Sequence, residues 1–282
     1  MKNLLTLDDA AAHLQKAYRE KRLIPFLGAG FSIPLQLPPW KELTNWMGKE
    51  LGFESGLFEL HGRDEQLAGY FDLEHKEHLP WFVERMKEKF HHPDVEDRRK
   101  GSKQHKALAR RNFRTIYTTN FEHHIEEALK DASKKAEPLV KLEDFLRATD
   151  DDTCQVIKFH GDLKHPETVV LTESHFFNRM RLEAAPDQRL RADLLGNSFL
   201  FIGYSFNDAN IRYIWYRMNE LRSEQAGGAP AVVPPERQCY WATFGVGDVQ
   251  PRLLQEWNIK VISLDPSDKS KSVVDLLDVL DK

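Results

Sequence analysis

The sequence predicts an α/β protein: a Rossmann-like, doubly wound, mostly parallel sheet with a helical insertion subdomain. Short apolar runs without polar alternation, such as residues 198–202 (SFLFI), are typical of strands covered on both faces. Such runs alternate with helical segments along most of the 282 residues, which implies parallel pairing through right-handed crossovers. Hydrophobic residues make up 41% of the chain, so a mainly disordered chain is excluded.

The first elements lead into a glycine-rich turn. Residues 6–22 are expected to form a helix, because apolar side chains recur on one face and Thr6 or Asp8 can cap it. Residues 23–27 (LIPFL) predict a buried strand that ends at a Gly-Ala-Gly turn. Residues 40–89 have a helical pattern, and we expect residues 91–101 (HHPDVEDRRKG) to be a solvated, charged connector.

After residue 102 strands and helices alternate again. We expect strands over residues 113–118, 155–159, 169–171, 198–202, 238–243 and 260–264. We expect helices over residues 104–110, 121–135, 173–195, 207–222, 248–257 and 271–280, and a flexible loop over 225–236. The sequence therefore predicts a single domain over residues 1–282, with a Rossmann-like core at 23–39 and 102–282 and a helical insertion at 40–101.

Charge and cysteine content exclude several classes of protein. The formal net charge is −4, so no global positive field indicates nucleic acid or an anionic membrane as a partner. Cys154 and Cys239 are far apart and form no CxxC pair, which excludes a zinc ribbon and argues against a disulfide framework. The start does not resemble a secretory signal, and no run of 18 apolar residues occurs. We expect a cytoplasmic protein.

Residues that could carry chemistry follow four predicted strands. In an open parallel sheet, ligands bind outside the carboxyl ends of the strands, where the strand order reverses. The four strand ends with glycines or reactive polar side chains are residues 28–32 (GAGFS), 118–122 (TTNFE), 160–162 (HGD) and 203–208 (GYSFND).

The first of these motifs suits a nucleotide. Gly28 and Gly30 would let a pyrophosphate approach the backbone, with the following amides as donors. The third glycine of the dinucleotide-binding pattern is absent, and Ile33 stands there. The alternative is a tight strand-to-helix turn. Trp40, close in sequence to this turn, is a candidate stacking surface.

Two side chains at strand ends have catalytic capacity. Asn120 could orient a ribose hydroxyl or a water, and its alternative role is a helix N-cap. His160 could act as a general base near neutral pH, and its alternative is a structural, hydrogen-bonded histidine. Ser205, Asn207 and Asp208 could bind an adenosine ribose or begin the next helix.

The remaining histidine pairs lack this context. His91-His92 and His123-His124 show no metal-ligand spacing with a third group. We expect His92 to lie in a loop and His123 on a helix surface.

The four motifs, in this order, resemble those of the sirtuin-like domain family, and most closely the bacterial sirtuin-like NAD hydrolases of antiphage defence. The resemblance covers about residues 24–208, and residues 105–122 (HKALARRNFRTIYTTNFE) are particularly similar to that branch. It implies that Asn120 and His160 are the catalytic residues. The residues that it and the position of Trp40 suggest for binding NAD are Gly28, Ala29, Gly30, Phe31, Ser32, Trp40, Thr119, Glu122, Gly203, Ser205 and Asp208.

The chain departs from the family pattern in two ways. The family usually has Asp two residues after the catalytic Asn, and here that residue is Glu122. Deacylating sirtuins carry a four-cysteine zinc ribbon that helps to form their acyl-peptide channel, and two cysteines cannot build one.

The resemblance implies an NAD glycohydrolase that cleaves the nicotinamide–ribose bond, with NAD as substrate and no metal. Its products would be nicotinamide and ADP-ribose, and its role the depletion of NAD in antiphage defence by abortive infection. Because unchecked NAD hydrolysis would kill the cell, we expect control by homo-oligomerisation or by a partner, such as a HerA-like ATPase from a neighbouring gene. The alternatives are a non-catalytic NAD or ADP-ribose sensor and an NAD-dependent protein deacylase, against which the missing ribbon argues.

Overall fold

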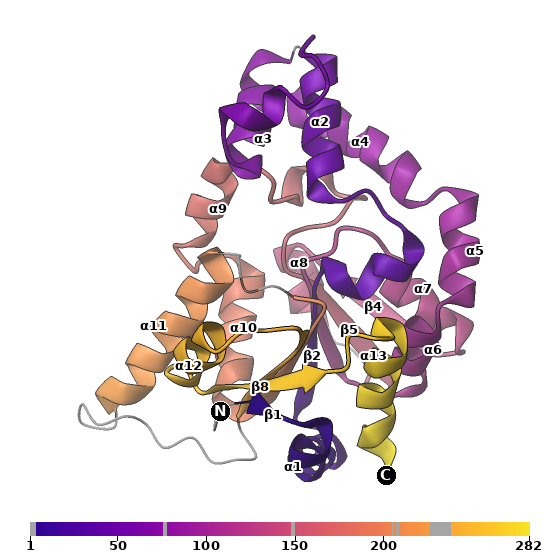
Figure 1. Ribbon diagram of the computed structural model, residues 1–282, viewed down its shortest axis with the longest axis vertical. Helices are drawn as coiled ribbons and strands as arrows, with labels where there is room; N and C mark the ends of the chain where they lie inside the picture. Colours follow the sequence, from indigo (N-terminus) through magenta and orange to yellow (C-terminus); the bar gives the residue numbers. More distant parts are fainter. Residues whose placement is uncertain (1–3, 76–77, 148–149, 205, 207–208, 226–237) are drawn as a thin grey trace.

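A single parallel sheet organises the described part of the chain in the computed structural model (Figure 1). The structure describes all residues except 1–3, 76–77, 148–149, 205, 207–208 and 226–237. Within these bounds eight strands pair in the order β1-β8-β7-β6-β2-β3-β5-β4, and every pairing is parallel. The strands are β1 (Leu4–Leu5), β2 (Leu23–Leu27), β3 (Thr115–Thr118), β4 (Lys135–Leu139), β5 (Thr153–Lys158), β6 (Ser198–Ile202), β7 (Cys239–Phe244) and β8 (Ile259–Leu264). The predicted fold class is confirmed.

Helices cover both faces of this sheet (Figure 1). One face packs against α1 (Leu7–Arg19), α6 (Lys103–Arg110), α7 (His124–Asp131) and α13 (Lys269–Asp278). The other face packs against α10 (Ala185–Gly196), α11 (Ala209–Gln225) and α12 (Val249–Gln255). All five residues of β2 and of β6 are buried, which explains why these two strands are apolar without alternation.

A helical subdomain lies between β2 and β3 in the sequence. It contains α2 (Trp40–Glu50), the 3₁₀ segment η2 (Phe58–His61), α3 (Asp64–Glu74), α4 (His78–Phe90) and α5 (Pro93–Gly101). Its apolar core also takes in Leu163 and Leu171, which follow β5. The subdomain therefore sits at the carboxyl edge of the sheet, and Figure 1 shows it beyond the sheet together with α9 (Glu173–Arg179). The domain boundaries given above stay a prediction.

The prediction of a solvated, charged connector over residues 91–101 is wrong, because Pro93–Gly101 form helix α5. The His92 side chain accepts a bond from the Asp94 amide at the N-terminus, and Pro93 occupies the first turn. Acidic residues stand in the first turn and basic residues in the last, as the helix dipole favours. Val95 and Arg99 are buried, so this charged segment is partly core.

Two other expectations differ from the structure. Residues 169–171 form no strand; Val169 and Leu171 are buried in the core of the helical subdomain instead. The helix expected over 121–135 is shorter, and β4 begins at Lys135. This strand lies at the sheet edge, where Pro138 is tolerated because one side needs no partner.

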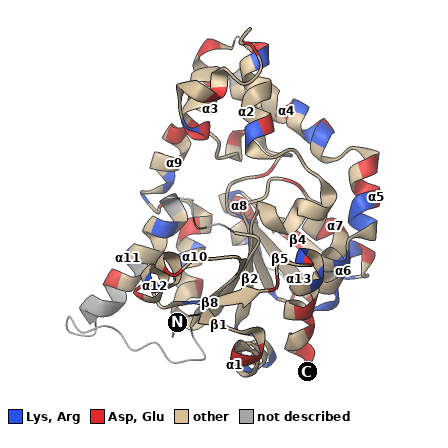
Figure 2. Cartoon of the chain, viewed as in Figure 1, with Lys and Arg blue, Asp and Glu red and all other residues tan. Residues whose placement is uncertain are grey.

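The strand order reverses beside β2. From there the chain builds β3 and β5 on one side, and β6, β7 and β8 on the other. Acidic and basic residues are interspersed over the outer helices in the view of Figure 2. No helix within the described ranges is long and apolar enough to cross a membrane.

Candidate active site

The glycine turn after β2 interlocks with the end of β6. Gly28 N donates to Ile202 O at 3.0 Å, and Gly30 N donates to Gly203 O at 2.8 Å. Gly203 has φ +66°, and a Cβ there would lie 2.1 Å from Phe31 N. Only glycine fits this crossing of two backbones. The turn continues as the 3₁₀ segment η1 (Ala29–Leu35), so the tight strand-to-helix turn that the sequence allowed is present.

Side chains along this turn face different ways. Ala29 is exposed, whereas Phe31 is fully buried in the core and packs against His105 with ring centroids 4.8 Å apart. Phe31 therefore offers no side chain to a ligand, and its backbone is engaged as well, because its amide donates to Gly28 O at 2.9 Å and its carbonyl accepts from Gln104 Nε2. Ser32 is 3% exposed and points toward the loop that follows β3.

Asn120 stands at the end of β3 with its backbone fixed. Its amide donates to Thr118 Oγ1 at 3.0 Å, and that hydroxyl donates to Leu27 O at 3.0 Å. The Thr119 amide also donates to Leu27 O, at 3.2 Å. Helix α7 begins at His124 with His123 as its N-cap residue, so Asn120 does not cap it and the alternative role is excluded.

Three polar side chains meet beside the glycine turn. Ser32 Oγ donates to Glu122 Oε1 at 2.7 Å, and Asn120 Nδ2 lies 3.1 Å from both Ser32 Oγ and Glu122 Oε1. Glu122 is fully buried and Asn120 is 8% exposed. With its amide nitrogen committed to these partners, Asn120 keeps its carboxamide oxygen for another ligand. The longer Glu122 side chain thus reaches the glycine loop.

His160 lies at the end of the neighbouring strand β5. The register pairs Thr118 with Lys158, so Asn120 and His160 each follow by two residues at the same sheet edge. The His160 carbonyl accepts a bond from Val170 N at 2.8 Å, and its ring packs edge-on to Phe176 at 5.5 Å. Gly161 has φ +90°, and a Cβ there would lie 2.1 Å from Thr168 O. The register thus places the two candidate catalytic residues at the same edge of the sheet, after neighbouring strands.

A buried ionic cluster beneath this edge was not expected. Lys158 is 1% exposed; its ammonium donates to Glu122 O and lies 3.3 Å from Glu126 Oε1. His123 Nε2 pairs with Asp162 Oδ1 at 2.7 Å. The placement of His123 on a helix surface was wrong, since it is 4% exposed. A lysine inside the apolar run VIKF of β5 was the one signal of this cluster in the sequence.

Three residues of this cluster form a candidate metal-ligand set that the sequence analysis did not identify. Ligand atoms of His123, Glu126 and Asp162 lie within 4.8 Å of one another, and these residue types bind Zn²⁺ and similar ions. Burial would raise the pKa of Asp162, but the hydrogen bond with His123 and the charge of Lys158 outweigh it and lower that pKa. The Lys158 ammonium thus already supplies positive charge among these carboxylates.

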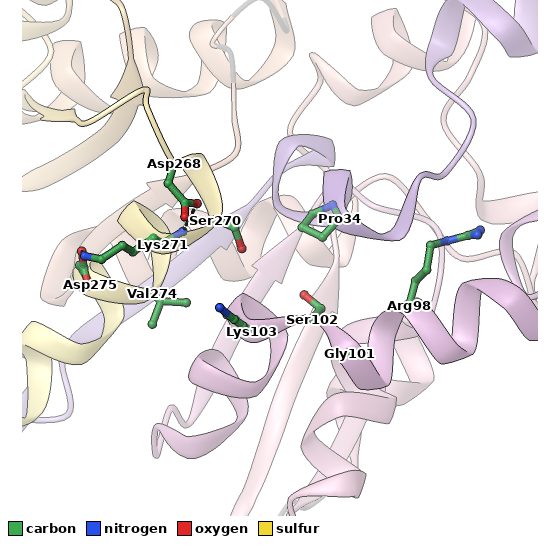
Figure 3. A pocket seen from close by; sticks show the side chains of 10 residues that line it. All are labelled: Pro34, Arg98, Gly101, Ser102, Lys103, Asp268, Ser270, Lys271, Val274 and Asp275. Atoms are coloured by element: carbon green, nitrogen blue, oxygen red, sulfur yellow. Dashed lines mark hydrogen bonds and ion pairs between the residues drawn. The ribbon is translucent and has the colours of Figure 1, made fainter.

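Two pockets flank the site. One of 590 Å³ lies between the end of η1 and the starts of α6 and α13 (Figure 3), and none of its lining residues is a predicted site residue. Figure 3 shows Pro34 on one side and Lys271 and Val274 of α13 on the other. A second pocket of 410 Å³ is lined in part by His123, Asp162 and His165, so it borders the buried cluster.

Of the predicted nucleotide-binding residues, Trp40 lies away from the sheet edge, and two others lie outside the described residues. Trp40 begins α2 and packs against the core of the helical subdomain. Ser205 and Asp208 lie outside the described residues, as does Asn207.

The comparisons with known proteins agree with this geometry. Residues 114–262, more than half of the chain, match the family model of the SIR2-like domain. The chain therefore belongs to the SIR2-like domain family, whose motifs the strand ends carry.

Several curated proteins are similar over most of this chain. The NAD(+) hydrolase ThsA of Acinetobacter baumannii (strain 532279) is 30% identical over 216 residues, which are 72% of this chain and 40% of that protein. The NAD(+) hydrolase ThsA of Bacillus cereus (strain MSX-D12) is 27% identical over 205 residues, 72% of this chain and 41% of that protein. The chain spans about two-fifths of the length of these curated relatives.

Proposed function

We propose that this protein is an NAD glycohydrolase that releases nicotinamide and ADP-ribose. The observation that carries the proposal is the placement of Asn120 and His160 on adjacent strand ends, next to the glycine crossing of Gly28, Gly30 and Gly203. Relatives named NAD(+) hydrolase support it. Sheets of this kind bind dinucleotides at this edge.

The reaction breaks the bond between ribose C1′ and the cationic nicotinamide nitrogen. Nicotinamide leaves neutral with the bonding electron pair, so no acid is needed, and an oxocarbenium-like ribose remains. Water adds at C1′, and His160 accepts the proton that the water loses. Asn120 positions the water or a ribose hydroxyl through its carboxamide oxygen. General-base help is worth about 10²–10⁴ in rate.

The glycine turn would hold the pyrophosphate at Ala29, which is its exposed residue. The amides of Gly28, Gly30 and Phe31 do not take part, because each already donates to a backbone carbonyl. Binding of this remote group orients the reacting carbon, which raises the rate of cleavage. We assign no metal to the reaction, because Lys158 already provides a cation among the buried carboxylates.

We further propose that cleavage is gated. Asn120 and His160 are only 8% and 7% exposed, whereas the reacting carbon must come within about 3–3.5 Å of its catalytic groups. Opening of the sheet edge by self-assembly, or by a partner such as a HerA-like ATPase, would admit NAD. Such control suits an NAD-depleting effector in antiphage defence.

Product analysis tests the proposed function. The purified chain is incubated with NAD, alone and with the product of the neighbouring gene, and nicotinamide and ADP-ribose are separated by chromatography. We expect equimolar nicotinamide and ADP-ribose from the wild type in at least one condition, and a loss of at least about 10²-fold in His160→Ala. Full turnover by His160→Ala would contradict the assignment, and so would the absence of nicotinamide in every condition.

A further inference from the structure

Two buried contacts join the loop that carries Asn120 to the loop that carries His160. Lys158 lies two residues before His160 and Asp162 two residues after it. The Lys158 ammonium donates to the Glu122 carbonyl, and the Asp162 carboxylate pairs with His123 at 2.7 Å. Both partners belong to the loop that follows Asn120. Lys158 and Asp162, on either side of His160 in the sequence, therefore both bind residues of the loop that follows Asn120.

Backbone bonds complete this connection. Phe159 N donates to Thr118 O at 2.7 Å, and Leu163 N donates to Phe121 O at 3.1 Å. The two side-chain contacts lie next to these bonds in sequence: Lys158 directly precedes Phe159, and Glu122 and His123 directly follow Phe121. They join the end of β5 and the residues after it to the residues that follow β3.

Stability alone is a poor reason for this cluster. Lys158, Glu126 and Asp162 are each at least nine-tenths buried, and desolvating such charges costs about as much as their attraction returns. Both carboxylate oxygens of Glu126 lack a hydrogen-bond partner. Apolar side chains at positions 158 and 126 together would avoid this cost, but an apolar residue at position 158 could not bind the Glu122 carbonyl.

We propose that Lys158 is a positioning residue for NAD cleavage: its bond to the Glu122 carbonyl fixes the Asn120–Glu122 loop at the separation from His160 that the reaction needs. This inference rests on the proposed function. Lys158 touches no reacting atom and acts through the loop. A misplacement of about 1 Å can cost about 10²-fold in rate.

A pair of variants separates positioning from charge balance. Lys158→Met removes the ammonium but keeps the stem, and leaves Glu126 as an unpaired buried charge. Lys158→Met combined with Glu126→Gln removes that charge as well. We expect the double variant to recover most of the thermal stability lost in the single variant. Its kcat should stay about 10–10²-fold below that of the wild type, and its KM for NAD should lie within about threefold of the wild-type value.

Lys134 offers the matched control. Its ammonium also donates to a backbone carbonyl, that of Arg111 at 2.7 Å, and it stands between α7 and β4, away from the carboxyl edge. Lys134→Met should leave kcat unchanged. Recovery of kcat together with stability in the double variant would overturn the positioning role.

Hydrogen exchange gives a readout that does not depend on turnover. In the double variant we expect faster amide exchange over residues 119–123, with exchange in β2 and β6 unchanged. Unchanged exchange over 119–123 would overturn the proposal whether or not NAD is cleaved. If the wild type released no nicotinamide, the assignment as an NAD glycohydrolase would be overturned instead. The exchange comparison would still decide whether Lys158 holds the loop.

Discussion

The Ser32 hydroxyl donates a 2.7 Å hydrogen bond to Glu122 Oε1 across 90 residues of sequence. This contact ties the glycine turn after β2 to the loop after β3. Because Asn120 Nδ2 lies 3.1 Å from the same carboxylate oxygen, one acidic group orients both a residue of the turn and the proposed catalytic amide.

Shortening or neutralising Glu122 should impair catalysis. Glu122→Asp lacks the methylene needed to reach Ser32 and Asn120 together, and Glu122→Gln removes the charge that strengthens both bonds. A hydrogen bond to a charged group is worth about 1.5–3 kcal/mol, so kcat should fall by about 10–10²-fold in either variant. Steady-state kinetics of nicotinamide release measure this. Ser32→Ala removes both Ser32 contacts but keeps the bond between Asn120 and the Glu122 carboxylate, so it should cost less; an equal loss would contradict the orienting role of Glu122.

Glycine at position 203 should be required, and Gly245 offers a comparison. Both have positive φ, +66° and +59°, but a Cβ at Gly245 meets nothing within 4 Å, whereas at Gly203 it would lie 2.1 Å from Phe31 N. Gly245→Ala should cost only the left-handed backbone penalty of about 1–2 kcal/mol.

Gly203→Ala should cost more in unfolding free energy and also abolish NAD binding, because the glycine turn must move. Denaturant unfolding and calorimetric titration with NAD measure the two effects. Equal losses of stability in the two variants would show that crowding at the crossing is unimportant.

Several parts of this architecture could be predicted from the sequence, and others could not. Strands β2 and β6 have the predicted bounds, because a short continuous apolar run is typical of a parallel strand that is covered on both faces. The placement of Asn120 and His160 at the same sheet edge follows from a general rule, that the carboxyl ends of parallel strands share an edge.

The predictions that were wrong also have physical reasons. The prediction of a loop at helix α5 is wrong because its many charges are typical of a solvated segment, whereas His92 and Pro93 at its start are typical of a helix N-terminus. Strand β4 (KAEPL) lacks β-branched residues because an edge strand is only half covered. The burial of His123 and Lys158 depends on partners that tertiary structure brings together, and the lysine within the apolar run VIKF is its single local signal in the sequence.

His105 should make the fold sensitive to acid. Burial, and then the charges of His124 and Arg99, lower its pKa to about 3. The unfolded chain therefore binds a proton between pH 6.5 and pH 3 that the folded chain does not, so stability falls as pH falls through this window. The slope for one such histidine is about 1.4 kcal/mol per pH unit.

His105→Asn tests this effect, because Asn keeps an acceptor for Ser102 but does not titrate. Its free energy of unfolding should be below wild type at pH 7.5, and the difference should narrow by about 2 kcal/mol between pH 6.5 and pH 5. Urea unfolding at a series of pH values gives the comparison. Parallel curves for the two proteins would contradict a neutral, buried His105.

Chelation should leave NAD cleavage unchanged. If Lys158 is the cation that balances the buried carboxylates, then EDTA treatment followed by gel filtration should alter neither turnover nor thermal stability. Zinc and manganese added back should have no effect. A loss of activity on chelation that either ion restores would assign His123, Glu126 and Asp162 to a metal instead.

The location of the dinucleotide tests the account most directly. The catalytically impaired variant His160→Ala, crystallised with NAD, should show the pyrophosphate against the glycine turn and the nicotinamide ribose C1′ between Asn120 and the position of residue 160. NAD seated instead in the 590 Å³ pocket between Pro34 and Lys271, with Asn120 untouched, would contradict it.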